Sequence, residues 1–155
     1  MQRRARPHEK DLWMLDRFVS NLSPYRPHLL SVLRIVTALL FLEHATQKLF
    51  HFPAMQILAG AAPRPGGGPP SWFVLVGILE FAGSLLLVAG YWTRTAAFIL
   101  SGEMAVAYFM AHAPHSFFPI LNFGEAAILF CFIYLYIAAA GPGAWALDNH
   151  IRGTR

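Results

Sequence analysis

The sequence predicts an all-α membrane protein: an antiparallel bundle of four transmembrane helices, preceded by an amphipathic helix on the membrane surface. Three observations predict it. The 155 residues are 56% hydrophobic and only 13% charged, whereas about a quarter of the residues in an average soluble domain are charged. The mean hydropathy is +0.46. Four apolar segments, each near the roughly 20 residues that a helix needs to cross a bilayer, are separated by runs rich in proline, glycine and polar residues.

The first 27 residues are expected to form a basic cytoplasmic tail and a short interfacial helix. Residues 1–10 are rich in arginine, and within residues 11–22 the apolar side chains recur at helical spacing. The charged residues of that stretch fall largely off the apolar stripe, and Trp13 suits the headgroup boundary. This pattern predicts a helix that lies on the cytoplasmic membrane surface, with Trp13 as an anchor.

The transmembrane domain is predicted at residues 28–148, followed by a cytoplasmic tail at 149–155. Breakers such as PRPGGGPP, APHSFFP and GPG mark the ends of its segments. The stretch from 51 to 71 is too long for a turn and too apolar for a plain linker, so we expect a re-entrant or interfacial segment there. The four spans are predicted at about 29–50, 72–90, 95–113 and 121–140.

The placement of lysine and arginine predicts that both termini are cytoplasmic, because cytoplasmic loops carry an excess of these residues. Arg34 lies within the first span near its inner end, so we expect it to extend toward lipid phosphates as an anchor, and we expect Arg94 to anchor the inner end of the third span. The net charge of +4 comes mainly from the tail, and no basic stripe favours a nucleic-acid partner. The inner side holds nine basic residues and the outer side two, namely Arg3, Arg4, Arg6, Lys10, Arg17, Arg26, Arg94, Arg152 and Arg155 against Lys48 and Arg64.

Each predicted span contains one glutamate, and a charge at the centre of a bilayer costs at least ~2.5 kcal/mol. At 1.5 Å per helical residue, all four glutamates fall between the outer surface and the midplane. We therefore predict one polar, ligand-binding cavity in the outer half of the bundle. The alternative is that protonated glutamates only hold the helices together. The residues expected at the cavity are Glu43, His44, Gln47, Glu80, Glu103, His112, Asn122 and Glu125.

The residue patterns that the apolar segments lack exclude or disfavour some kinds of chemistry at such a cavity. No glutamate is followed three residues later by histidine, which disfavours the di-iron centres of carboxylate bundles; a mononuclear site with His44 or His112 stays open, but no metal is predicted. Cys131 is the single cysteine, so a thiol relay within one chain is excluded. A quinone fits better, because it can enter from lipid and place its polar atoms near glutamate and histidine.

Several blocks carry a family resemblance: LRIVTALLFLEHATQKLF, GILEFAGSLLLVAGYWTRTAA, FFPILNFGEAAIL and GPGAWALD. In this order, over roughly residues 32–148, they resemble the DoxX family of small membrane proteins. Ala45 departs from the pattern, since family members often have glycine there. The matched residues are Arg34, His44, Lys48, Leu49, Glu80, Gly83, Gly90, Thr93, Arg94, Asn122, Gly124 and Glu125.

The resemblance implies a four-helix protein of the bacterial inner membrane. Some members look like subunits of thiosulfate–quinone oxidoreductases, and others are associated with redox-stress complexes. The leading prediction is therefore a subunit of a membrane redox system that handles quinone or a small sulfur species, with electrons carried by partner subunits and oligomerisation possible. The alternatives are a non-catalytic scaffold subunit, whose glutamates lock helices together, and a small-molecule or proton-coupled carrier.

Overall fold

The computed structural model describes residues 13, 16–17, 19–53 and 71–152, and these residues form helices joined by turns with no strand among them. Helix α2 is preceded by one turn of 3-10 helix, and α4 continues into a π-helical turn, η3. The elements are η1 (Ser23–Tyr25), α2 (Arg26–Phe50), α3 (Ser71–Ala89), α4 (Thr93–Ala107), η3 (Tyr108–His112), α5 (Pro119–Asn122), α6 (Glu125–Ala140) and α7 (Leu147–Arg152).

The long helices lie at the four predicted segments, with one clear difference. The fourth segment is divided, because Phe123 has a left-handed backbone with φ 56° and Gly124 follows it outside the helix. The short helix α5 ends before this break, and α6 begins only at Glu125. Helix α7 occupies part of what the sequence suggested would be a tail.

Two helices are long and apolar enough to cross a membrane by length and composition: Ser23–Phe50 with 28 residues and Trp72–Ala89 with 18 residues. A third, Glu125–Ala140, is apolar but shorter. Length and composition thus support two spans directly. That α4 and α6 also cross the bilayer remains a prediction.

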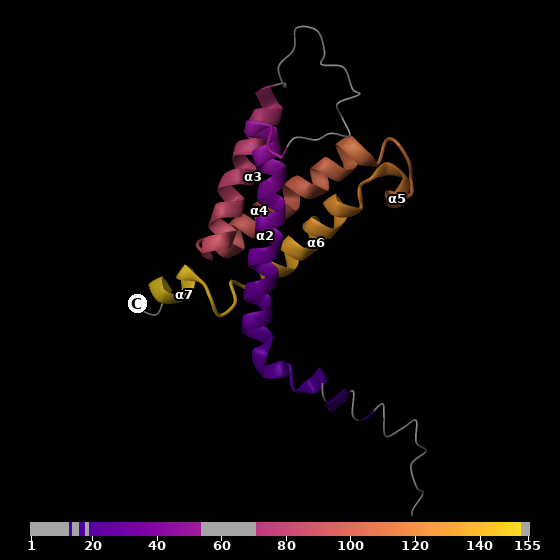
Figure 1. Cartoon of the computed structure of the whole chain (residues 1–155). Helices are drawn as coiled ribbons and strands as arrows, with labels where there is room; N and C mark the ends of the chain where they lie inside the picture. The colour runs from indigo at the N-terminus through magenta and orange to yellow at the C-terminus, as the bar shows by residue number, and fades with distance from the viewer. Residues whose placement is uncertain (1–12, 14–15, 18, 54–70, 153–155) are drawn as a thin grey trace, which may run out of the picture.

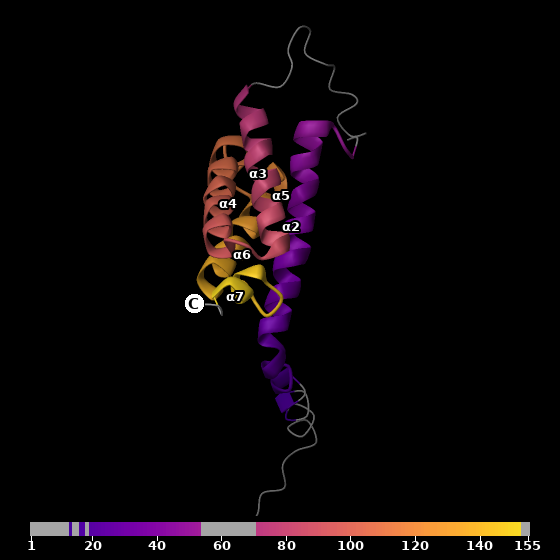
Figure 2. The ribbon, with the colours of Figure 1, turned by 90° about the vertical axis from the view of Figure 1, so that its left-hand side faces the viewer.

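The helices pack in pairs, α2 against α3 and α4 against α6, and α3 also contacts α4. In Figure 1 the α4–α6 pair runs obliquely behind α2 and α3, and the view in Figure 2 shows the first turns of α2 projecting beyond the other helices. Gly83 allows α3 to approach α4 closely, because a Cβ at this position would lie 2.9 Å from the Leu100 methyl groups. The core between the helices includes Phe41, Leu87, Leu100, Tyr134 and Ile137.

The outer faces of all four long helices are apolar. Leu39 on α2, Leu75 on α3, Phe98 on α4 and Phe132 on α6 are 48%, 66%, 65% and 64% exposed. Soluble monomers rarely expose apolar patches larger than a few hundred Å². Lipid is the environment in which such faces are stable.

Two predicted features lie outside the described residues: the basic tail at 1–10 and most of the re-entrant stretch, at 54–70. Of the predicted interfacial helix, Trp13, Asp16, Arg17, Val19 and Ser20 are described, and they are helical and exposed. The position of this helix at the membrane surface remains a prediction.

Candidate functional site

Charged side chains gather at two places between the helices, and the first is the arginine end, which comprises Arg34, Arg94 and Asp148. Arg34 was expected to reach lipid phosphates, but its side chain is fully buried. Its guanidinium donates to the carbonyl oxygens of Val88 at 3.0 Å and Pro142 at 2.8 Å, and also to those of Leu87 and Trp145. The end of α3 and the segment before α7 leave these carbonyls free, so they hold the guanidinium inside the protein.

The other two charged groups of the arginine end also bond with helix termini. Arg94 donates to the carbonyl oxygens of Ala138 and Ala139, at 2.7 and 2.6 Å, at the last turn of α6. The Asp148 carboxylate accepts from the backbone N–H groups of Trp92 and Thr93, both at 3.0 Å, where α4 begins. A carboxylate at a helix N-terminus satisfies free donors and complements the helix dipole. The arginine end therefore joins α2, α3, α4 and α6; whether Arg94 also anchors the membrane stays a prediction.

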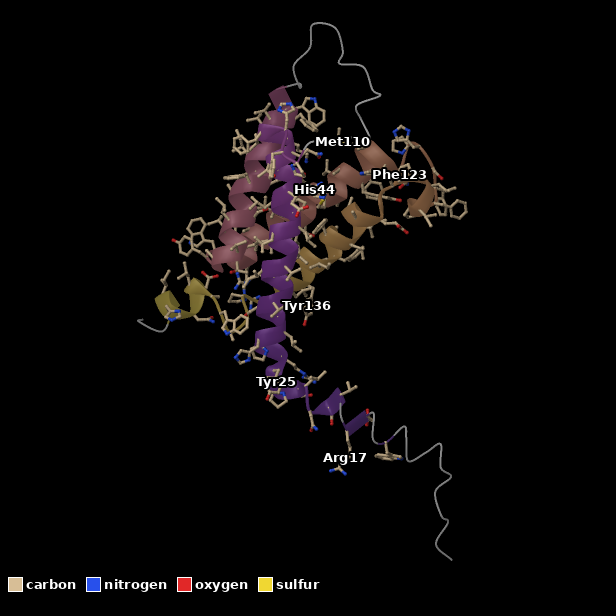
Figure 3. All side chains as sticks on the ribbon, viewed as in Figure 1. Arg17, Tyr25, His44, Met110, Phe123 and Tyr136 are labelled. Carbon is tan, nitrogen blue, oxygen red and sulfur yellow. The ribbon has the colours of Figure 1, made fainter. Side chains whose placement is uncertain are left out.

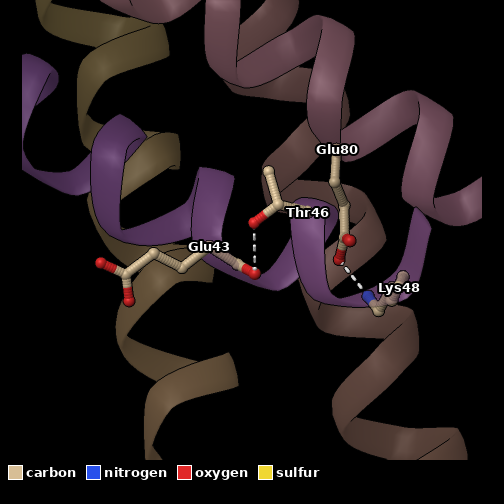
Figure 4. A network of polar contacts seen from close by, with 4 residues as sticks. All are labelled: Glu43, Thr46, Lys48 and Glu80. Atoms are coloured by element: carbon tan, nitrogen blue, oxygen red, sulfur yellow. Dashed lines mark hydrogen bonds and ion pairs between the residues drawn. The ribbon is translucent and has the colours of Figure 1, made fainter. Parts of the chain in front are cut away.

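The second place is the glutamate cluster, which comprises Lys48, Glu80 and Glu103. Lys48 on α2 forms an ion pair with Glu80 on α3 (Figure 4). The Glu80 side chain is 1% exposed and the Lys48 side chain 19%. The Lys48 ammonium also lies 5.5 Å from the ring centre of Phe73. An ion pair this deep is weakly screened, so each partner depends on the other for neutralisation.

Glu103 on α4 completes the cluster. Its carboxyl group lies within reach of a hydrogen bond to that of Glu80 and within electrostatic reach of Lys48. Yet Oε2 of Glu80 and Oε2 of Glu103 are both buried, and neither has a donor in the part of the chain that the structure describes. A buried polar atom without a partner costs roughly 1–3 kcal/mol. The cluster therefore has the capacity to accept two further hydrogen bonds.

Aromatic rings line the cluster on its α2 and α6 sides. Tyr134 lies within electrostatic reach of both glutamates and donates its hydroxyl hydrogen to the carbonyl oxygen of Thr37 at 3.1 Å. The ring of Phe41 lies 5.3 Å from that of Tyr134 and 5.1 Å from that of Phe130, between ring centres. His44 packs against Phe41 with its ring centre 6.1 Å away, and its imidazole interacts electrostatically with Glu80. The carboxyl groups thus lie near a group of packed aromatic rings from α2 and α6.

Two of the predicted site residues on α2 lie at its edge or turn away from it. Glu43 is exposed, and Figure 4 shows its carboxylate directed away from the Lys48–Glu80 pair. Only its backbone oxygen takes part in the network drawn there, as it accepts from the Thr46 hydroxyl at 3.1 Å. Gln47 is half-buried. Any ligand contact by either residue remains a prediction.

The remaining predicted residues belong to a separate network beside α5. The Asn122 side chain is buried, and it donates to the Ser116 carbonyl at 2.8 Å and accepts from the Gly124 N–H at 2.8 Å. His112 Nδ1 lies 2.9 Å from the Asn122 backbone oxygen, and Glu125 is exposed at the start of α6. Figure 3 shows the neighbouring Phe123 at the corner of the molecule, well away from His44. The residues of the single predicted cavity are therefore divided between two places, and only Glu80 and Glu103 lie together, with the exposed His44 within electrostatic reach of Glu80.

The sequence reasoning did not assign Lys48 and Tyr134 to the site. Lys48 was counted only among the basic residues of the outer side, although its spacing of four residues from His44 places both on one helix face. That spacing was a usable signal, since an intramembrane glutamate needs a cation nearby. Tyr134 gave no signal beyond a hydroxyl within an apolar segment.

The cluster is suited to hydrogen bonding and proton exchange. Across the described residues, no three histidine, cysteine, aspartate or glutamate side chains are grouped as metal ligands. Carboxyl groups facing each other beside a lysine can hold a proton and donate or accept it at a ligand oxygen.

Comparison with known proteins places the chain in a family. The DoxX family model matches residues 29–113, more than half of the 155 residues. The chain belongs to the DoxX family. Its relatives include an uncharacterised protein of Haemophilus influenzae, 46% identical over 134 residues, which cover 84% of this chain and 96% of the relative. Inner membrane protein YqjF of Escherichia coli is 30% identical over 126 residues, covering 76% and 88%. No solved structure matches the chain. The match, which covers most of α2 and all of α3, α4 and η3, identifies this chain as a DoxX membrane protein.

Proposed function

We propose that this DoxX protein is the quinone-binding membrane subunit of a redox system, and that the glutamate cluster binds the quinone head group. The observation that carries the proposal is the pair of buried carboxyl oxygens without donors, on Glu80 and Glu103. They can accept the hydroxyl hydrogens of a quinol, and a protonated carboxyl group can donate to a quinone carbonyl. Both oxygens lie beside aromatic rings in a bundle whose outer faces are apolar. A quinone reaches such a site from lipid, packs its ring against the aromatic side chains and exchanges protons with carboxyl groups.

The charge of the cluster favours a quinone over the other substrate class that the family resemblance implies. A small sulfur oxyanion would meet two carboxyl groups and only one lysine, and like charges at short range repel each other in a weakly polar interior. A quinone carbonyl is neutral and needs only a donor. Electrons would come from a partner subunit, because the described part of the chain offers only carboxyl, imidazole, ammonium and phenol groups at the cluster.

We further propose that α2, α3, α4 with η3, and α6 all cross the bacterial inner membrane, with both termini in the cytoplasm. The 20 residues from Thr93 to His112 are continuously helical and would extend about 30 Å. The E. coli relative is named an inner membrane protein. The nine-to-two division of basic residues supports the orientation.

Reporter fusions test this topology. Alkaline phosphatase, which is active only outside the cytoplasm, is fused after Tyr91 and after His115. Four spans predict an inactive fusion after Tyr91 and an active one after His115. If only α2 and α3 cross the membrane, both fusions are inactive, and the four-span proposal fails.

Quinone binding is tested by equilibrium titration of a short-chain ubiquinone into the purified protein in nanodiscs. The wild type is expected to bind saturably. Glu103→Leu removes one of the two free carboxyl groups and is expected to weaken binding by about tenfold, equivalent to the ~1.4 kcal/mol of one hydrogen bond. Glu43→Leu is the matched control, because its carboxylate points away from the cluster.

The outcomes separate the three functions. Equal quinone affinity in Glu103→Leu and Glu43→Leu contradicts the proposed site, and a wild type without saturable binding contradicts the function. A scaffold predicts no binding and less folded protein for Glu103→Leu. A carrier predicts that vesicles containing only this chain take up solute.

A further inference from the structure

We propose that the glutamate cluster stores one exchangeable proton, shared between the carboxyl groups of Glu80 and Glu103. Two features of the structure lead to this inference: the contact between the two carboxyl groups and the imbalance of charge around them. The proton is the one that the cluster would deliver to a ligand oxygen. The inference rests on the proposed function only for the identity of that acceptor.

The contact requires a proton. Carboxylate oxygens can only accept hydrogen bonds, so two ionised carboxylates in contact would repel each other. Glu80 and Glu103 are nevertheless within reach of a side-chain hydrogen bond to each other, and Oε2 of each is buried without a donor from the described residues. One proton between the carboxyl groups converts the repulsive contact into a short, charge-assisted bond.

The charge balance also requires one proton. Lys48 supplies one positive charge by pairing with Glu80, and two ionised glutamates would leave the cluster with one negative charge in excess. The other titratable groups that face the pair are His44 on α2 and the phenol of Tyr134 on α6. Tyr134 uses its hydrogen in a bond to Thr37, and a neutral imidazole adds no charge. A single stored proton makes the cluster neutral, which is the state favoured in a weakly polar interior.

The burial of Glu80 indicates that the proton stays on the pair until a ligand accepts it. Glu80 is 1% exposed, whereas Glu43 on α2 and Glu125 at the start of α6 are exposed. Glu43 and Glu125 therefore provide control positions for substitutions in the cluster.

Infrared spectroscopy of the protein in lipid vesicles measures the stored proton directly, in the absence of any quinone. Exposed carboxyl groups are ionised near pH 7.5, so the carbonyl stretch of a protonated carboxyl group reports buried ones alone. The wild type is expected to show this band with the intensity of one group per chain. Glu103→Gln and Glu80→Gln each leave one carboxylate paired with Lys48, so each is expected to lose the band. Glu43→Gln and Glu125→Gln are expected to retain it.

Lys48→Met is expected to increase the intensity of the band, whereas the glutamine variants remove it. Without the ammonium, both glutamates must be neutral, and the band is expected to double in intensity. A wild-type spectrum without the band, a band that survives in both cluster variants, or an unchanged band in Lys48→Met would each overturn the inference. The wild-type measurement needs no variant to fold, and it can succeed even if the quinone titration fails.

Discussion

The arginine end and the glutamate cluster both place charged side chains between helices, but they differ in what those charges contact. Arg34, Arg94 and Asp148 bond with backbone groups that helix ends leave free. In the glutamate cluster, charged groups contact one another, and one oxygen of each glutamate has no donor. Complete hydrogen bonding stabilises a fold, whereas incomplete hydrogen bonding costs stability and keeps a capacity to bind. The comparison supports a structural role for the charged groups of the arginine end and the proposed binding role of the glutamate cluster, although the Thr93 hydroxyl oxygen at the arginine end is also buried without a partner among the described residues.

The largest effect on stability is expected from Arg34→Met. The change removes a donor from four carbonyl groups, of which that of Leu87 keeps the N–H of Gly90. It should lower the free energy of unfolding by about 3–5 kcal/mol, since each orphaned buried acceptor costs roughly 1–3 kcal/mol. Denaturant titration in mixed micelles measures it. Arg26→Met is the control, because Arg26 is exposed and its side chain donates only a long bond to Ser23. Equal stability of the two variants would contradict a structural role for the arginine end.

Gly141→Ala is expected to have the second largest effect on stability. Gly141 has φ +104°, and a Cβ there would lie 2.9 Å from the Arg94 guanidinium. The strained backbone and the displaced arginine should together cost about 1–3 kcal/mol. Gly102→Ala provides the contrast, since its Cβ would meet nothing within 4 Å and alanine favours a helix. Thermal unfolding should show a lower midpoint for Gly141→Ala only; equal midpoints would refute the argument.

Asp148→Ala removes the acceptor for the first N–H groups of α4 and should cost about 1–2 kcal/mol, as for other N-terminal helix caps. Asp16→Ala, at an exposed position near the start of the chain, should leave unfolding unchanged. The same thermal unfolding experiment compares them. If Asp148→Ala were as stable as Asp16→Ala, capping of α4 by Asp148 would not stabilise the protein.

The smallest effect on stability is expected from Glu103→Gln, within about 0.5 kcal/mol of the wild type. The glutamine amide can donate to Glu80 and so replaces the shared proton without adding charge. Stability is therefore retained, although the exchangeable proton is lost. A loss of stability comparable to that of Arg34→Met would make the cluster a structural lock and favour a scaffold function.

The positions of the long helices could be predicted from the sequence because a bilayer demands about 20 apolar residues in a row. The boundaries at Phe50 and Ala89 differ from prediction by no more than one residue. The division of the last segment at Phe123 could not be predicted, because it depends on a left-handed residue that an apolar pattern does not encode.

The burial of Arg34 could not be predicted because its acceptors are distant in sequence. The carbonyl groups of Leu87 and Trp145 are 53 and 111 residues away. Seen from the first span alone, a long basic side chain near a helix end has only lipid phosphates as partners. In the folded protein, backbone carbonyl groups accept the hydrogen bonds of Arg34 instead.

The structure brings two of the predicted site residues together, and their binding of a ligand stays a prediction. Glutamates in apolar segments must face inward, which led to Glu80 and Glu103. Glu43 and Lys48 lie in places that the sequence alone did not indicate. Consecutive residues in a helix are rotated by about 100°. The side chains of Glu43 and Lys48 therefore lie on different faces of α2 and cannot both face α3. The structure turns Lys48 toward Glu80 and leaves Glu43 outside.

The most direct test of the central claim is a crystal structure of the protein grown in a lipidic mesophase with a short-chain ubiquinone. If the glutamate cluster binds a quinone, the map should show quinone density beside Tyr134. A quinone carbonyl oxygen should then lie roughly 2.6–3.2 Å from a carboxyl oxygen of Glu80 or Glu103. A map at saturating quinone in which the two glutamates and Lys48 contact only one another would contradict it.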